Sequence, residues 1–282
     1  GEKMRKISLH EVTEKVKESV IKINYNLDQS LVALIQKAIQ NEIKDLSKSI
    51  LSDILENQEI AREGKVPLCQ DTGVVVVFLE IGRDVFFDGD IYESINEGVR
   101  QGYSEGYLRK SIVNHPFNRV NTLDNTPAII HTTIVPGNTL KLKITSKGGG
   151  SENMSKVTML TPADGIEGVK KLVLDQILYA GGKPCPPIIV GIGIGGNLEK
   201  SALLAKESLM RDLDDESNDA IIAQLERDLY KEINALGVGP MGVGGETTCL
   251  AVKINYYPMH IASLPVAINI QCHSARHTEV II

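Results

Sequence analysis

Tryptophan is absent from this chain, and aromatic residues make up only 4% of it. Many proteins that bind nucleic-acid bases stack them on aromatic side chains, so binding of this kind does not dominate here. Positive charge is also scarce. The 30 Lys and Arg are outnumbered by 36 Asp and Glu, which gives a formal net charge of −6 at pH 7. Because phosphate binding needs a basic surface, this balance argues against nucleic acid as the main partner.

Long apolar runs are missing as well. No stretch approaches the length of a membrane span, and the N-terminal residues lack the apolar core of a signal peptide. We therefore expect a cytoplasmic protein with no membrane partner.

Cysteine is the third scarce residue. Only 4 cysteines occur, at positions 69, 185, 249 and 272, and no two of them form a C-x-x-C pair. Disulfides are rare in a reducing compartment, and this spacing excludes a zinc knuckle. A metal cluster whose ligands come from distant loops stays open.

The hydrophobic pattern predicts one catalytic domain over residues 1–282, with a mainly helical N-terminal region over 1–64. Further along, it predicts a strand over 74–81, helices over 91–107 and 163–181, and a hairpin turn at 136–138. The predicted fold is mixed α/β, of the α+β type, in which the helical region is joined to mixed sheets with flanking helices.

A formal G-x-G-x-x-G occurs at Gly191, Gly193 and Gly196, between a predicted strand and a predicted helix. A Rossmann dinucleotide site also needs a second strand with an acidic residue roughly 20 positions further on. Here the nearby acidic residues fall between two helical segments, so we expect neither a β–α–β unit nor a Rossmann fold. The glycines then serve the close packing of a strand against a helix.

Two polar loops stand beside predicted strands. In "KVPLCQDTG", Cys69 is followed at once by an amide, a carboxylate and a hydroxyl. Polar groups at such a loop often serve chemistry, although a small buried thiol beside an Asx turn also explains them. In "TSKGGGSENMS", three glycines either bring backbone N–H groups close to a carboxylate or phosphate, or form a flexible hairpin tip. Cys185 and Cys272 also occupy loop–strand junctions, whereas we interpret Cys249 as a buried structural thiol.

Eight motifs, in the same order and over nearly the whole chain, carry a family resemblance. They are "PLCQDTG", "YLRKSIV", "NRVNTLDNTPAIIH", "KGGGSENMS", "KPCPP", "GIGIGGNLEKSALLAKESL", "GVGPMGVGGETT" and "HIASLPVAINIQCHSARH". Together they resemble the α subunit of two-subunit class I fumarate hydratases, an iron–sulfur hydro-lyase family that also includes L(+)-tartrate dehydratase.

The resemblance implies a 4Fe–4S cluster held by Cys69, Cys185 and Cys272. One iron has no cysteine ligand and acts as a Lewis acid toward the substrate. Asp71 would take part in proton transfer as the catalytic residue, although a carboxylate that only orients the loop is the alternative. The substrate-binding residues implied are Gln70, Asp71, Arg109, Gly148, Gly149, Gly150 and His260, and Arg276 and His277 would lie behind the ligands.

The implied reaction is the reversible dehydration of a small 2-hydroxy dicarboxylate, with (S)-malate to fumarate as the first reading. The alternatives are an L(+)-tartrate dehydratase α subunit and a non-catalytic iron–sulfur sensor on the same scaffold. Single-chain relatives carry a further domain, whereas this chain ends at Ile282, soon after the last implied ligand. We therefore expect a separate β subunit and self-association to an α₂β₂ assembly.

Overall fold

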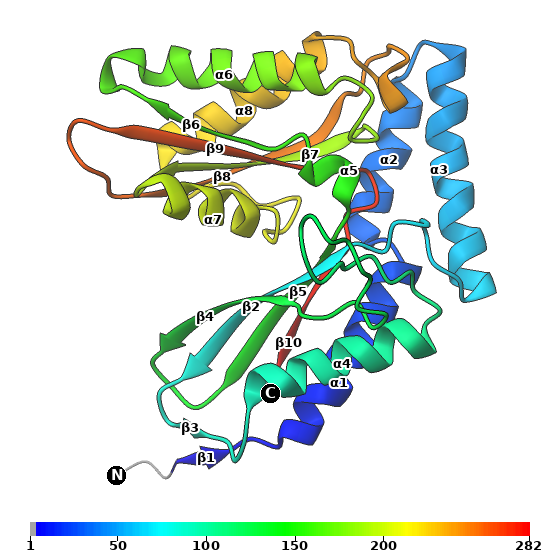
Figure 1. Ribbon diagram of the computed structural model, residues 1–282. Helices are drawn as coiled ribbons and strands as arrows, with labels where there is room; N and C mark the ends of the chain where they lie inside the picture. Colours follow the sequence, from blue (N-terminus) through cyan, green and yellow to red (C-terminus); the bar gives the residue numbers. More distant parts are fainter. Residues whose placement is uncertain (1–3) are drawn as a thin grey trace. The chain divides into compact units, whose positions relative to one another are not determined.

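The computed structural model describes residues 4–282, which divide into two compact units (Figure 1). Unit 1 comprises Gly1–Leu27, Asn57–Gly149 and Arg276–Ile282, and unit 2 comprises Asp28–Glu56 and Gly150–Ala275. Each unit is built from segments that lie far apart in the sequence. The first three residues of the helical region predicted over 1–64 lie outside the described residues.

Unit 1 contains a four-stranded mixed sheet in the order β10-β5-β2-β4. Its strands are β2 (Val74–Gly82), β4 (Ile129–Val135), β5 (Leu140–Lys147) and β10 (His277–Ile281). Strand β2 pairs parallel with β4 and antiparallel with β5, which pairs antiparallel with β10. Two short strands, β1 (Arg5–Lys6) and β3 (Val85–Phe86), form a separate parallel pair.

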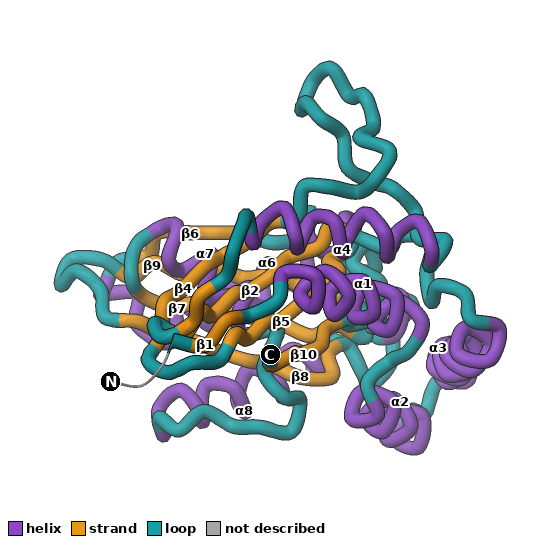
Figure 2. Tube along the Cα trace, turned by 90° about the horizontal axis from the view of Figure 1, so that it is seen from below, coloured by secondary structure: helices purple, strands orange, loops and turns teal. Residues whose placement is uncertain are grey.

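Two helices cover one face of this sheet, α1 (Leu9–Tyr25) and α4 (Ile91–Glu105). They lie side by side in both views (Figures 1 and 2). Their contact is close because α4 carries glycine at the crossing: a methyl group at Gly98 would lie 2.6 Å from Val16, and one at Gly102 would lie 2.2 Å from Val20. Strands β2 and β5 add alternate aliphatic side chains to the same core.

Unit 2 contains a second four-stranded sheet in the order β6-β9-β7-β8. Its strands are β6 (Lys156–Leu160), β7 (Ile188–Gly195), β8 (Cys249–Tyr257) and β9 (Leu264–Gln271). Helices α6 (Gly165–Ala180) and α8 (Ala220–Ala235) pack on one face through a shared aliphatic core, and α7 (Leu198–Ser208) lies on the other (Figure 1).

The other helices of the N-terminal region are α2 (Gln29–Asn41), which begins at the N-cap Asp28, and α3 (Asp45–Gly64). Helix α3 belongs to unit 2 as far as Glu56 and to unit 1 from Asn57. Three short helical turns complete the chain, α5 (Gly149–Glu152), η1 (Pro162–Asp164) and η2 (Pro240–Gly242).

The predicted mixed α/β fold is confirmed, but two local predictions are wrong. The turn at 136–138 does not join a hairpin, because β4 and β5 both pair with β2 and not with each other. The second wrong prediction is that no β–α–β unit follows the glycine motif. Strand β8 pairs parallel with β7, and α7 and α8 connect the two strands. That strand ends at Tyr257 and offers no acidic residue, so the Rossmann arrangement is still missing.

The glycine motif has the packing role predicted for it. A methyl group at Gly191 would lie 2.4 Å from the carbonyl of Ala205, and one at Gly193 would lie 2.0 Å from that of Ser201. Both carbonyls belong to α7. Only glycine therefore lets this helix approach the centre of the sheet.

Candidate active site

The 68–73 segment of unit 1 leads from α3 into β2, and side chains hold four of its carbonyls. Each of these carbonyls accepts a hydrogen bond from a side chain in a different part of the unit. They are those of Leu68 (from Asn57 Nδ2, 2.8 Å), Asp71 (from Arg276 Nη1, 2.5 Å), Thr72 (from the Tyr103 hydroxyl) and Gly73 (from Asn125 Nδ2, 3.1 Å). The N–H of Leu68 in turn donates to the carbonyl of Asn24 at 2.8 Å. The segment is thus preorganised by its protein surroundings.

None of these anchoring residues except Arg276 is singled out by the sequence patterns. Asn24 and Tyr103 are fully buried on faces of α1 and α4 that are mostly apolar. A polar residue at a position that helical periodicity places in the core is only a weak sign of a structural hydrogen bond. Here both residues support the loop. Asn125 adopts a positive φ of 61° in a long loop, which no pattern predicts.

The Asp71 carboxylate accepts two backbone hydrogen bonds. Its Oδ1 accepts from the N–H of Gly73 at 3.0 Å, as in an Asx turn, and its Oδ2 accepts from the N–H of Gly149 at 2.8 Å. The second bond joins the two polar loops found in the sequence. Backbone N–H groups on both oxygens fix the orientation of the carboxylate.

Arg276 is one of the largest fully buried side chains of the protein. Its Nη1 donates to the carbonyl of Asp71 and to Asn24 Oδ1 (3.1 Å), while its Nε has no hydrogen-bond partner among residues 4–282. A methyl group at Gly148 would lie 3.4 Å from Nη2 and 3.2 Å from Asp71 Oδ2. The guanidinium therefore lies close behind the Asp71 loop. His277 follows as the first residue of β10, opposite Thr145 of β5.

Three further residues of the predicted site lie at the same loop of unit 1. Cys69 is exposed, and its sulfur accepts the N–H of Asp71 at 3.4 Å. Gln70 beside it is also exposed. Arg109 is anchored next to the loop because its carbonyl accepts from Thr72 Oγ1 at 2.8 Å, and its guanidinium has no acidic partner among residues 4–282.

Cys185 and Cys272 lie at the same end of the sheet in unit 2. Cys185 precedes β7, Cys272 follows β9, and these strands are neighbours. The carbonyl of Cys185 hydrogen-bonds with Nδ1 of His273 at 2.9 Å and accepts its backbone N–H at 3.3 Å. Cys185 has a φ of 56°, which is uncommon for a residue with a side chain and is often found at functional sites. Gly150, the last of the three glycines, also belongs to unit 2.

Cys249 differs from the other three thiols. It is fully buried at the start of β8, and burial raises its pKa well above the ordinary value. A thiol that stays protonated is a poor metal ligand, so its side chain fits the structural role predicted for it. No group of three His, Cys, Asp or Glu that could hold a metal ion is found within the described part of the chain.

His260 lies elsewhere in unit 2. It is exposed in the loop between β8 and β9, and its Nδ1 accepts the N–H of Ala262 at 3.1 Å. Cys185 and Cys272 lie at the opposite end of the same sheet, because β7 begins beside Cys185 and ends opposite Tyr257. The structure therefore does not group His260 with these two cysteines within one chain.

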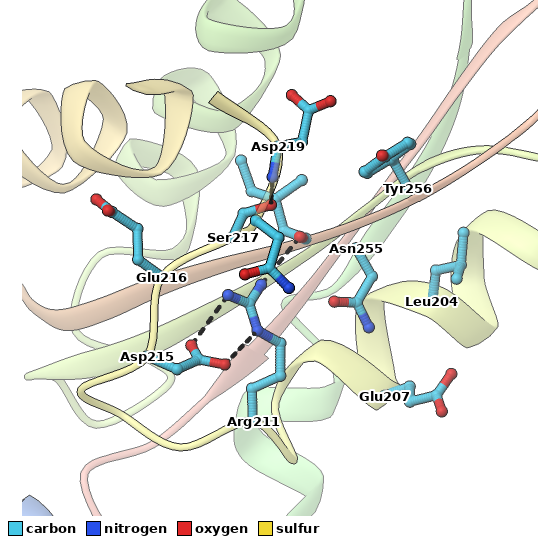
Figure 3. A pocket seen from close by; sticks show the side chains of 11 residues that line it. Leu204, Glu207, Arg211, Asp215, Glu216, Ser217, Asp219, Asn255 and Tyr256 are labelled. Atoms are coloured by element: carbon cyan, nitrogen blue, oxygen red, sulfur yellow. Dashed lines mark hydrogen bonds and ion pairs between the residues drawn. The ribbon is translucent and has the colours of Figure 1, made fainter. Parts of the chain in front are cut away.

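A hollow of about 460 Å³ in unit 2 is a further polar feature (Figure 3). Its one cation among the described residues, Arg211, binds Asp215 through two bonds (3.0 and 2.9 Å), and its Nη1 donates to the nearby Glu226 (2.7 Å). Arg211 also donates to the carbonyl of Ile254, whose N–H donates to Glu226. These bonds cover the outer edge of β8, so the cluster protects an edge strand.

The fumarate hydratase (Fumerase) family model matches residues 13–281 of the chain. The chain belongs to this family. Its members are hydro-lyases, enzymes that remove water from or add it to a substrate, and this chain is one of them. The recognition of the family from eight sequence motifs is confirmed.

Similar proteins carry a narrower description. A protein of Methanocaldococcus jannaschii, provisionally named as an L(+)-tartrate dehydratase subunit alpha, is 43% identical over 272 residues, which cover 94% of each chain. The L(+)-tartrate dehydratase subunit alpha of Escherichia coli K12 is 26% identical over 286 residues, covering all of this chain and 94% of its own. The corresponding protein of Shigella boydii matches to the same extent. Among the helices of residues 4–282, none has the length and apolar character that a membrane span requires.

Proposed function

We propose that this chain is the α subunit of a hydro-lyase that dehydrates a small 2-hydroxy dicarboxylate, with L(+)-tartrate as the first candidate substrate. The observation that carries the proposal is the Asp71 carboxylate, which is fixed by the N–H groups of Gly73 and Gly149 two residues after an exposed cysteine. A carboxylate held in this way suits a proton-transfer step next to a bound substrate.

The residues named from the family resemblance have properties that fit a 4Fe–4S cluster. Cys69 is exposed and Cys185 and Cys272 are partly exposed at loop–strand junctions, whereas Cys249 is buried and burial raises its pKa. The proposed cluster is held by the first three of these. When bound, it supplies Lewis-acid chemistry at the iron that has no cysteine ligand.

The chain's own residues supply the rest of the chemistry. The exposed Arg109 guanidinium, which has no acidic partner among the described residues, pairs with a substrate carboxylate. Gln70 and the backbone of Gly148–Gly150 orient the bound acid. Asp71 holds or releases the proton at the carbon next to that carboxylate, and His260 completes the set proposed from the resemblance.

Tartrate takes precedence over malate because the similar proteins are named as tartrate dehydratase α subunits. Malate, the first reading of the sequence, becomes the alternative. The two acids differ by one hydroxyl, which a site with one more polar contact recognises. The same names support a separate β subunit as the partner of this chain, in an assembly that we propose to be α₂β₂.

The test is turnover by the anaerobically reconstituted enzyme, assembled with its β subunit, on L(+)-tartrate and on (S)-malate. We expect activity with tartrate and its loss in Asp71→Ala and Arg109→Met. Arg119→Met removes another exposed cation and serves as the matched control with activity unchanged. A cluster that forms without turnover on either acid would contradict the proposal and favour the sensor reading.

A further inference from the structure

The corner between α2 and α3, residues 42–47, binds a glycine-rich loop of the same unit, residues 237–246. Glu42 is buried in this corner, although it carries a carboxylate. Its Oε1 accepts two N–H groups of the corner itself, both at 3.0 Å, and its Oε2 accepts the N–H of Glu246 at 2.9 Å. The loop comes so close that a methyl group at Gly245 would lie 2.6 Å from Glu42 Oε2.

Two further side chains of the corner bind the same loop. The hydroxyl of Ser47, which is fully buried, donates to the carbonyl of Gly244 at 2.5 Å. The Nζ of Lys44 donates to the carbonyl of Val243. Together with Glu42, these side chains fix the last peptide groups of the loop in place.

The loop also contacts the turn that carries Cys185. The N–H of Met241 donates to the carbonyl of Pro186 at 2.7 Å. The two backbones meet with no side chain between them, because a methyl group at Gly242 would lie 2.6 Å from the Cα of Gly182. The N–H of Cys185 donates in turn to the carbonyl of Gly182 at 3.1 Å. Hydrogen bonds therefore link the corner, the loop and the turn in this order.

The backbone of Cys185 is strained, since its φ of 56° lies in the left-handed region. This conformation is unfavourable for a residue with a side chain, and it persists only where the surroundings hold it. On one side, the carbonyl of Cys185 hydrogen-bonds with the ring and the backbone N–H of His273. On the other side, the turn meets the 237–246 loop. The direction of the Cys185 side chain thus depends on contacts that begin at Glu42.

We propose that Glu42 is a positioning residue for Cys185. Through the 237–246 loop it keeps the turn in the one conformation that presets the direction of the thiol. A preset thiol loses little conformational freedom when it binds iron, so the metal is held more tightly. The inference deepens the proposed function and rests on it for the role of Cys185 as a ligand. It also gives a role to the motif "GVGPMGVGGETT", which contains the loop.

The decisive experiment measures how fast iodoacetamide alkylates each cysteine of the metal-free full chain, with mass spectrometry as the readout. Glu42→Ala should raise the rate at Cys185 about 10-fold or more, because loss of a hydrogen bond to a charged group makes local opening of the turn that much more frequent. The rate at Cys69, which belongs to unit 1, should stay unchanged. Glu56→Ala removes an exposed carboxylate of α3 and serves as the matched control, with every rate unchanged.

A merely structural role of Glu42 would lower the melting temperature and leave the alkylation rate of Cys185 unchanged. That result would overturn the proposal. If Glu42→Ala fails to fold, Ser47→Ala carries the test, since it removes one bond to the same loop. It should raise the rate at Cys185 to a smaller extent, and an unchanged rate would count equally against the proposal.

The reconstituted protein gives a second readout. The cluster of Glu42→Ala should be lost to a chelator faster than that of the wild type, as followed by absorbance, and an equal rate of loss would overturn the proposal as well. A wild type that forms no cluster, or that is inactive once assembled, would refute the proposed function. The alkylation rates test the positioning of Cys185 without a cluster and without turnover, so the two failures can be told apart.

Discussion

The three consecutive glycines allow a test of the position of the Asp71 carboxylate, because each glycine has different surroundings in the structure. A methyl group at Gly148 would lie 3.2 Å from Asp71 Oδ2, a contact tight enough to displace the carboxylate. At Gly149 the nearest atom is Asp71 Oδ2 at 3.9 Å, and at Gly150 it is the carbonyl of Lys183 at 3.7 Å. The φ angles of all three lie outside the left-handed region, so the backbone itself accepts alanine at each position.

We therefore expect Gly148→Ala to damage activity and Gly150→Ala to be tolerated. Displacing Asp71 Oδ2 weakens its bond from the Gly149 N–H, and a hydrogen bond to a charged group contributes about 1.5–3 kcal/mol. At about 1.4 kcal/mol per factor of ten, kcat/KM should fall about 10- to 100-fold. The stability cost should stay near 1–3 kcal/mol, so the variant still folds.

The assay is kcat/KM of the reconstituted enzyme with tartrate, together with urea unfolding of each variant. Gly150→Ala is the matched control, since it adds the same methyl group two residues away. If Gly148→Ala keeps more than half of the activity, or if Gly150→Ala loses as much, the geometry assigned to Asp71 is wrong.

Three further predictions concern the scaffold. Tyr103→Phe removes the buried hydroxyl that holds the Thr72 carbonyl and should lower the unfolding free energy by about 1–3 kcal/mol in urea, whereas Tyr107→Phe, at an exposed position, should change nothing. Arg211→Leu leaves the buried Glu226 without its cation and should cost about 3–5 kcal/mol, against less than about 1 kcal/mol for Arg227→Leu in an exposed pair. Burial raises the pKa of Cys249, so above the ordinary thiol pKa of 9.0 the thiol ionises only in the unfolded protein. The unfolding free energy should therefore fall by up to about 1.4 kcal/mol for each pH unit above that value. Cys249→Ala should abolish this pH dependence.

Much of the fold follows from local patterns, because helices and strands with one buried face leave a period in the sequence. The helices α4 and α6 and the strand β2 match their predicted ranges within a few residues. The pairing of β4 and β5 with β2 was missed, because a short turn between two strands does not say which neighbour each strand pairs with.

The candidate site, like the fold, could be predicted from the sequence only in part. The sequence motifs located the Cys69 and triple-glycine loops, and the structure joins them through the bond from Gly149 to Asp71. The supporting residues Asn24, Tyr103 and Asn125 could not be found in advance, since each acts across a large sequence separation and looks locally like an ordinary helix or loop residue. The distant position of His260 follows only from strand register.

The measurement that tests the central claim most directly is anaerobic reconstitution with iron and sulfide, followed by absorbance and EPR spectroscopy. It should be made on the wild type and on Cys69→Ser, Cys185→Ser, Cys272→Ser and Cys249→Ser. The account predicts a 4Fe–4S signal in the wild type and in Cys249→Ser, and its loss in the other three. Absence of a cluster from the wild-type protein, or a requirement for Cys249 in place of Cys185, would contradict it.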